Sequence, residues 1–124
     1  MYALDSDLLI AFLRGEPDAR TALRDHEDTR TTVFSALELL SGTEPASRRE
    51  QEALRLLQTL HPVAFDWNEM TTARRISDTL ARQGTPIGRN DELIAGICIA
   101  NGLTLVTRNR KQFSKIKGLK TVAW

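Results

Sequence analysis

Short apolar runs alternate with longer segments of helical periodicity along the whole chain. The runs are rich in Val, Leu, Ala and Thr, as expected for buried strands. They lie at residues 2–4, 29–34, 62–65, 103–106 and 120–124. Strands that alternate with helices pair in parallel, and helices cover both faces of the resulting sheet. The pattern therefore predicts a three-layer α/β/α fold with a central, mostly parallel sheet of roughly five strands.

The segments between these runs carry helix signals, such as Gly15 and Gly42 at helix ends. They cover residues 6–15, 17–26, 35–42, 47–60, 66–84 and 90–102. The helix at 66–84 opens with an Asp66/Glu69 capping box. Its expected buried stripe consists of Trp67, Met70, Ala73, Ile76 and Leu80. Residues 90–102 are apolar nearly all round, which predicts a central, buried helix.

With 124 residues, the chain has the size of a single domain, and we assign all of 1–124 to it. No apolar run approaches the roughly 20 residues of a membrane helix, and no signal peptide opens the sequence. The single cysteine, Cys98, excludes an internal disulfide and lies in an apolar segment, where a packed thiol is expected. We therefore expect a cytoplasmic protein in a reducing compartment, with no membrane partner.

Charge is unevenly distributed, although the net charge is only +1. Residues 101–124 contain six of the 17 Lys and Arg residues and no acid. The first hundred residues therefore hold 11 cations against all 16 acids. A basic tail on an acidic body is typical of contact with polyanions, and it is equally typical of a solvated surface.

Acidic residues follow the predicted strands. Asp5 comes directly after residues 2–4, and Asp7 follows with one serine between them. Glu38 comes one helical turn after 29–34, and Asp91 opens the buried helix. Asn109 follows the strand at 103–106. Because ligands bind at the carboxyl ends of parallel strands, we expect these side chains to converge there.

Helix capping explains each of these polar residues when it is taken alone. The candidate caps are Ser35 with Glu38, Asn90 or Asp91, and Asn109 with Gln112. Capping does not explain why two acids flank Ser6. Clustered carboxylates repel one another unless a cation neutralises them. Oxygen ligands without histidine or thiol suit Mg²⁺ or Mn²⁺ better than zinc.

The sequence resembles PIN-domain proteins and, among them, the VapC toxins of bacterial toxin–antitoxin pairs. The matching segments, in family order, are "LDSDLLI", "FSALELLSG", "ARQGTPIGRNDELIAGICIANGLTLVTRN" and "FSKIKGLKTVAW". By this resemblance Asp5, Glu38 and Asp91 match the family's acidic triad. Asn109 stands where many members carry a fourth acid, and Asp7 replaces the usual asparagine.

The resemblance implies a Mg²⁺-dependent endoribonuclease in which Mn²⁺ can substitute. Asp5 and Asp91 would bind the metal directly, and Glu38 would bind it directly or through water. The residues expected to support these ligands or the water are Ser6, Asp7, Ser35, Thr107 and Asn109. The residues expected to attract the RNA backbone are Arg108, Arg110 and Lys111.

The resemblance also implies two protein partners. VapC toxins form homodimers, and a small VapB-type antitoxin neutralises each toxin, often by placing a basic side chain in the acidic pocket. The first helix carries more apolar residues than one buried face needs, namely Leu9, Ile10, Phe12 and Leu13. These residues are candidates for such an interface as well as for the core.

Two other functions fit parts of the sequence. "LDSD" at 4–7 resembles the D-x-D motif of haloacid-dehalogenase-type phosphohydrolases, which also need a downstream lysine and a second acidic pair. The amide at Asn109 favours a catalytically impaired RNA-binding or regulatory module. His26 and His61 do not follow predicted strands, and no glycine-rich phosphate loop is present, so histidine-based and nucleotide-hydrolysing sites have no support.

Overall fold

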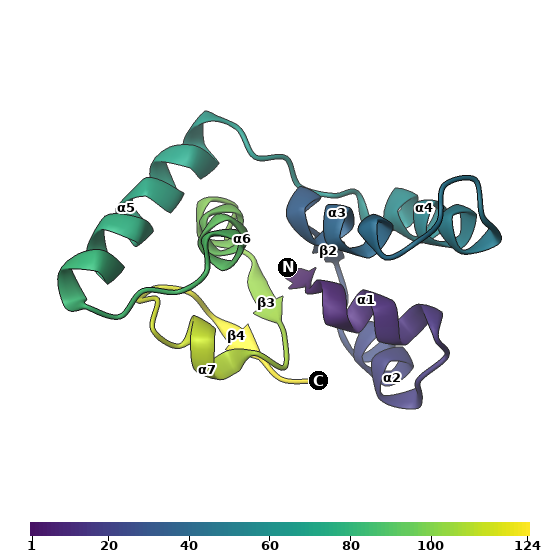
Figure 1. Cartoon of the computed structure of the whole chain (residues 1–124). Coiled ribbons are helices and arrows are strands. Elements are labelled where there is room, and N and C mark those ends of the chain that lie inside the picture. Colours follow the sequence, from purple (N-terminus) through teal and green to yellow (C-terminus); the bar gives the residue numbers. More distant parts are fainter.

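A sheet of four short parallel strands forms the middle layer of the structure, a computed structural model that describes residues 1–124 (Figure 1). The strands are β1 (Tyr2–Leu4), β2 (Thr29–Thr31), β3 (Thr104–Val106) and β4 (Thr121–Val122). Their order is β2-β1-β3-β4, and every pair is parallel. The predicted α/β/α fold with a parallel sheet is confirmed.

The sheet has four strands and not the five expected. Residues 62–65 contribute only one bridge, between Val63 and Thr32. The predicted strand at 29–34 ends early, because the Thr32 hydroxyl accepts a hydrogen bond from the Ser35 amide at 3.0 Å and so starts a helix. This cap places Val33 and Phe34 in a helix although their side chains favour strands.

Helices cover both faces of the sheet (Figure 1). One set consists of α1 (Ser6–Leu13), α2 (Pro17–Asp25), α3 (Val33–Ser41) and α4 (Arg48–Leu60). The other consists of α5 (Trp67–Gln83), α6 (Arg89–Ala100) and α7 (Arg110–Phe113). Ala3 and Leu105 face the core under α5 and α6, whereas Leu4 and Val106 face the core under α1–α4. Successive strand residues thus point to opposite faces of the sheet and pack into two separate hydrophobic cores.

The predicted stripe on α5 is confirmed for Ala73, Ile76 and Leu80, which are buried. It is wrong for Trp67 and Met70, whose side chains are 70% and 38% exposed. The reason is the length of α6, which ends at Ala100. Asn101, the next residue, donates a hydrogen bond to Glu69 at 3.1 Å, so the first turn of α5 projects past the end of α6.

The buried helix predicted at 90–102 corresponds to α6, in which Ile94, Ile97 and Cys98 are buried. It packs against α5 at very short range. A Cβ added to Gly96 would lie 2.8 Å from the Cβ of Ala73. No helix in the structure is long and apolar enough to cross a membrane.

Replacing Gly96 with alanine should therefore destabilise the fold by about 1–3 kcal/mol, because the added methyl group overlaps Ala73 and forces the two helices apart. Urea unfolding measures the change. Gly42→Ala is the matched control, since its new Cβ would make only an ordinary contact at 3.6 Å. The double variant Gly96→Ala/Ala73→Gly should recover part of the loss. Equal unfolding curves for Gly96→Ala and Gly42→Ala would contradict the close helix contact.

Candidate active site

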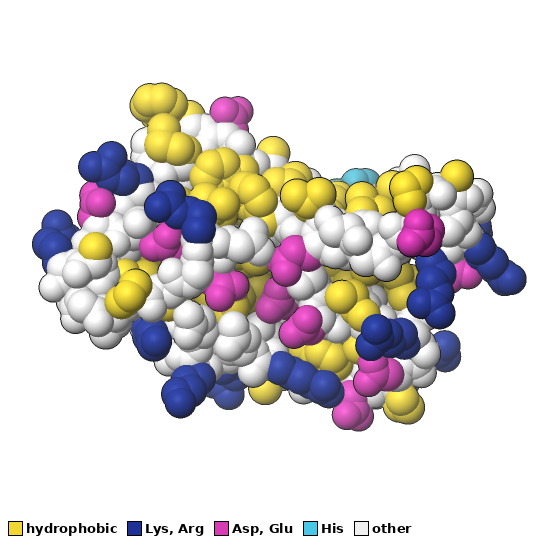
Figure 2. Space-filling view, viewed as in Figure 1, with side chains coloured by type: hydrophobic (Ala, Val, Ile, Leu, Met, Phe, Trp, Pro, Cys, Tyr) yellow, Lys and Arg dark blue, Asp and Glu magenta, His cyan; other side chains and the backbone are white.

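A polar pocket of about 350 Å³ opens at the carboxyl ends of the strands. Its lining contains no hydrophobic residue and consists of Asp5, Ser6, Asp7, Glu38, Asp91, Arg108 and Asn109. Figure 2 shows acidic side chains gathered near the middle of the face, where β1 and β3 end in Figure 1. The structure thus brings the four predicted acids and the amide together from four distant segments of the chain.

Asp5 is the most enclosed of these acids, with 9% of its surface exposed. It is the N-cap of α1, and its Oδ1 accepts a hydrogen bond from the Ser6 amide at 2.8 Å. Its Oδ2 accepts one from the Thr107 hydroxyl at 2.7 Å. The same hydroxyl accepts a hydrogen bond from the main-chain N–H of Asn109 at 3.0 Å. Asp5 is therefore held from both sides by the segments that leave β1 and β3.

Glu38 and Asp91 come from α3 and α6, and neither one caps its helix. The N-cap of α3 is Thr32, and that of α6 is Gly88, which makes no side-chain cap. The Nδ2 group of Asn90 instead donates a hydrogen bond to Glu38 Oε1 at 2.8 Å. The capping interpretation of these acids is wrong, and their carboxylates face the pocket.

Asn90 supports the site although the sequence pattern does not indicate it, because its place at the start of a helix favours a capping role. It bridges two helices by bonding a residue 52 positions away. The available signal was an amide directly before the candidate ligand Asp91. Asn109, the other proposed cap, makes no side-chain cap either.

Not every predicted supporting residue reaches the pocket. Ser35 is fully buried, and its hydroxyl accepts a hydrogen bond from Thr32 at 3.1 Å, so it bonds no carboxylate. Thr107 is also buried and acts only through Asp5 and Asn109. Arg108 lines the pocket, whereas Arg110 donates to the Thr121 hydroxyl at 3.4 Å and lies outside it. Lys111 lies outside it too, exposed on α7.

The environment of the pocket disfavours the charged forms of three of its acids, Asp5, Glu38 and Asp91. Burial raises the pKa of Asp5 above its usual value, opposed by hydrogen bonds from Thr107 and Ser6, and the charge of Asp7 adds to the rise. Burial also raises the pKa of Glu38 and of Asp91, and for both the charge of Asp5 adds to it. Hydrogen bonds from Asn90 and Ser6 oppose the rise at Glu38. A cation in the pocket would relieve this repulsion.

The donor chemistry fits a hard divalent ion. Every lining side chain other than Arg108 offers oxygen, and none is histidine or cysteine. No three acidic, histidine or cysteine side chains lie close enough in this arrangement to hold a metal ion together. The carboxylates would therefore have to close around an ion as it binds.

Comparison with known proteins identifies the family of this chain. Residues 2–119 match the PIN domain family. The chain belongs to that family. Ribonuclease VapC10 of Mycobacterium tuberculosis is 34% identical over 126 residues, which cover 97% of this chain and 91% of that protein. The tRNA(fMet)-specific endonuclease VapC of Shigella flexneri is 27% identical, with 99% and 97% covered.

A crystal structure of VapBC2 from Rickettsia felis, bound to a DNA fragment from its promoter, contains a chain with the same fold. It matches with a TM-score of 0.85 at 25% identity and covers 99% of this chain and 98% of that one. Together with the two VapC sequences, this match places our PIN domain among the VapC toxins.

The electrostatics of this PIN domain give a prediction about stability and pH. Below the usual aspartate pKa of 3.8, Asp5 is protonated in both the folded and the unfolded chain. Above it, the unfolded chain loses the proton first, because burial raises the folded-state pKa. The folded state then binds more protons, so its free energy of unfolding falls as pH rises.

Asp5→Asn removes this charge and keeps the shape of the side chain. The free energy of unfolding of Asp5→Asn minus that of the wild type should therefore increase between pH 4 and pH 7, as urea unfolding in EDTA would show. Glu44→Gln, at an exposed acid with no ion pair, controls for the loss of one charge. If the difference between the two free energies of unfolding stays constant or shrinks as pH rises, the pKa of Asp5 is not raised in the folded protein.

Proposed function

We propose that this protein is a Mg²⁺-dependent endoribonuclease, in which Mn²⁺ can substitute, and the toxin of a VapBC-type toxin–antitoxin pair. The observation that carries the proposal is the pocket in which Asp5, Asp7, Glu38 and Asp91 meet. The names of the VapC relatives, which are ribonucleases, support it. Cys98 takes no part, because burial raises the pKa of its thiol to about 12. We also place the protein in the cytoplasm, as its single buried thiol suggests.

Asp5 and Asp91 would hold the metal ion directly, and Glu38 would bind it directly or through water. The ion supplies charge neutralisation at the phosphodiester and lowers the pKa of the attacking water. The chain's own residues set the geometry. Thr107 and Ser6 fix the orientation of Asp5, and Asn90 fixes that of Glu38. A carboxylate with a raised pKa, such as Glu38, is suited to orient a water molecule and accept its proton.

Two features bear on the alternatives. The pocket lining contains no lysine, which a haloacid-dehalogenase-type phosphohydrolase requires. The amide of Asn109 favours a catalytically impaired RNA-binding module, but Asp7 brings a fourth carboxylate into the same pocket. The charge lost at Asn109 is thus replaced within the site. We therefore favour an active nuclease.

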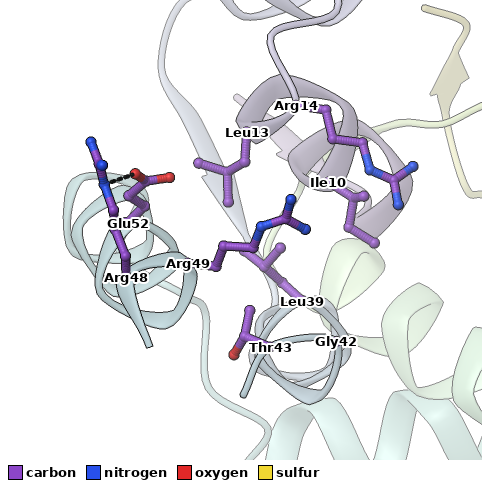
Figure 3. Close-up of a pocket in the computed structure, with 9 residues that line it drawn as sticks. All are labelled: Ile10, Leu13, Arg14, Leu39, Gly42, Thr43, Arg48, Arg49 and Glu52. Atoms are coloured by element: carbon purple, nitrogen blue, oxygen red, sulfur yellow. Dashed lines mark ion pairs between the residues drawn. The ribbon is translucent and has the colours of Figure 1, made fainter. Parts of the chain in front are cut away.

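A groove of about 480 Å³ between α1, α3 and α4 is our candidate docking site for the antitoxin (Figure 3). Ile10 and Leu13 from α1 and Leu39 from α3 supply its apolar surface. Arg14 and Arg49 line it without an ion-pair partner, and Arg48 pairs with Glu52 at 3.3 Å. The groove therefore suits a peptide segment that carries apolar and acidic side chains. Several of the matching structures are VapBC complexes, which supports an antitoxin as its occupant.

A second exposed apolar surface suits a homodimer. Trp67 and Met70 form it, one turn apart at the start of α5, and a further exposed apolar side chain, Leu37, lies on α3. Figure 2 shows hydrophobic side chains along the upper edge of the molecule, from the start of α5 toward α3 as these are labelled in Figure 1. Burial of such side chains is the usual driving force for subunit association.

The catalytic proposal predicts that Asp5→Ala and Asp91→Asn remain folded and lose RNA cleavage by at least ~100-fold, because each removes a metal ligand. Cleavage of a cellular RNA pool by antitoxin-free protein measures this. EDTA should abolish the wild-type activity, and Mg²⁺ or Mn²⁺ should restore it. Asp78→Asn is a control, since Asp78 only pairs with Arg74 on an exposed helix surface.

Cleavage by Asp91→Asn at the wild-type rate would show that the site is misplaced. RNA binding without cleavage in Mn²⁺ would favour the impaired binding module. Phosphate release from small phosphoesters without RNA cleavage would favour the phosphohydrolase. The three outcomes are read from the same protein preparations.

The groove gives a separate prediction about the antitoxin. Leu13→Lys places a charge on its apolar surface and should weaken binding of the neighbouring-gene antitoxin by at least ~10-fold, with RNA cleavage by the free toxin preserved. Leu54→Lys, on the exposed side of α4, is the matched control. Titration of labelled antitoxin gives both affinities. Equal affinities for the two variants would exclude this groove as the docking site.

A further inference from the structure

Arg108 is held at the edge of the acidic pocket by residues outside it. Its Nε donates a hydrogen bond to the main-chain oxygen of Trp124 at 3.2 Å. Its guanidinium carbon lies 3.6 Å from the centre of the Trp124 ring, in cation–π geometry. An ion pair at 3.6 Å joins it to Asp18 of α2. Arg108, whose side chain is about half exposed at 49%, therefore makes two contacts with Trp124 and one exposed ion pair with Asp18.

This arrangement differs from what the charges alone would produce. Arg108 is the only cation in a pocket lining that contains four carboxylates. A freely rotating guanidinium would be drawn to those carboxylates and would neutralise them. Its only ion pair is instead with Asp18, which does not line the pocket. The hydrogen bond and the ring stacking with Trp124 thus keep Arg108 beside the acids without joining them.

Trp124 is well placed to fix Arg108, because both follow paired strands. The Thr107 amide donates a hydrogen bond to the Val122 carbonyl at 3.0 Å. Residues 107 and 122 directly precede the two short segments that meet at the Arg108–Trp124 contact. The Trp124 ring also packs against the core under α1–α4. Its indole Nε1 is buried without a hydrogen-bond partner, which costs free energy of folding. Trp67, by contrast, is exposed to solvent.

The stacked geometry leaves part of the guanidinium available. A guanidinium has five N–H donors in one plane, and stacking occupies its face and not its edge. The Trp124 oxygen takes the Nε donor. The Asp18 side chain is 80% exposed, and an ion pair this exposed contributes little and is readily exchanged. An incoming phosphate can therefore bind the edge of Arg108 without disturbing the stack.

We propose that Trp124 is a positioning residue that holds Arg108 as a phosphate-binding group at the rim of the acidic pocket. This inference rests on the proposed RNA substrate. Trp124 itself touches no substrate, and it acts through Arg108. The pair lets the site attract a polyanion at its edge while its centre stays free for a cation.

Binding of a fluorescein-labelled single-stranded RNA in EDTA tests the proposal independently of cleavage. Fluorescence anisotropy at several salt concentrations compares wild type, Arg108→Ala, Trp124→Ala, Trp124→Phe and the double variant Trp124→Ala/Arg108→Ala. We expect Arg108→Ala and Trp124→Ala each to weaken binding about fivefold and to reduce the salt slope by ~0.7, the value of one phosphate contact. Trp124→Phe keeps a ring and should bind like the wild type.

The double variant separates positioning from general stability. It should bind no more weakly than Arg108→Ala alone, because Trp124 has no effect once its target is gone. Additive losses, an unchanged salt slope or wild-type binding by Trp124→Ala would each overturn the inference. Measurements are made below the thermal transition of every variant. If the wild type cleaves RNA in Mg²⁺ while Trp124→Ala binds normally, only the positioning role fails. If the wild type neither binds nor cleaves RNA, the proposed function fails.

Discussion

The parallel register of three strands is the constraint on which the site depends. Leu4 pairs with Val106, and Val106 pairs with Val122, so the residues that follow them leave the sheet at one level. The hydrogen bond from Thr107 to Asp5 spans 102 positions of sequence and closes this edge. A shift of one residue in β3 would turn Val106 away from its core and carry Thr107 away from Asp5. The packing of the core and the geometry of the site are therefore set by the same pairing.

The carboxylates of the pocket repel one another, and the fold is stabilised by its hydrophobic cores, which lie outside the pocket. Two hydrophobic cores, one on each face of the sheet, contain no acid from the pocket. Burial in the pocket instead destabilises the charged forms of Asp5, Glu38 and Asp91, and so raises the pKa of each. Sites of this kind typically trade stability for function. A cation that binds in the pocket would relieve the repulsion between these carboxylates, as a metal-dependent activity requires.

Local sequence patterns predicted most of the fold but only part of the site. The alternation of apolar runs and helical segments was enough to predict the layers and the parallel sheet. The strand ends, together with the start of the buried helix, were enough to predict that Asp5, Glu38 and Asp91 come together. The failures depend on tertiary contacts. Residues 62–65 have strand composition, yet only Val63 reaches a neighbouring strand. Trp67 is exposed because α6 is too short to cover it. Asn90 bonds a side chain on another helix, which no spacing rule within one helix can indicate.

The acidic pocket and the groove proposed for the antitoxin share two helices and differ in charge. α1 carries Asp7 toward the acidic pocket and Leu13 toward the groove, and α3 carries Glu38 and Leu39 in the same two directions. The groove exposes cations and the pocket exposes carboxylates. A single partner that covers both surfaces would therefore need acidic and apolar side chains for the groove and a basic side chain for the pocket. Such a partner would oppose the entry of a metal ion and of RNA together, because it would neutralise the acids and cover the rim where Arg108 lies. On this view, neutralisation by an antitoxin needs no change in the fold of the toxin, only occupation of surfaces that the sheet edge and the first helices already present.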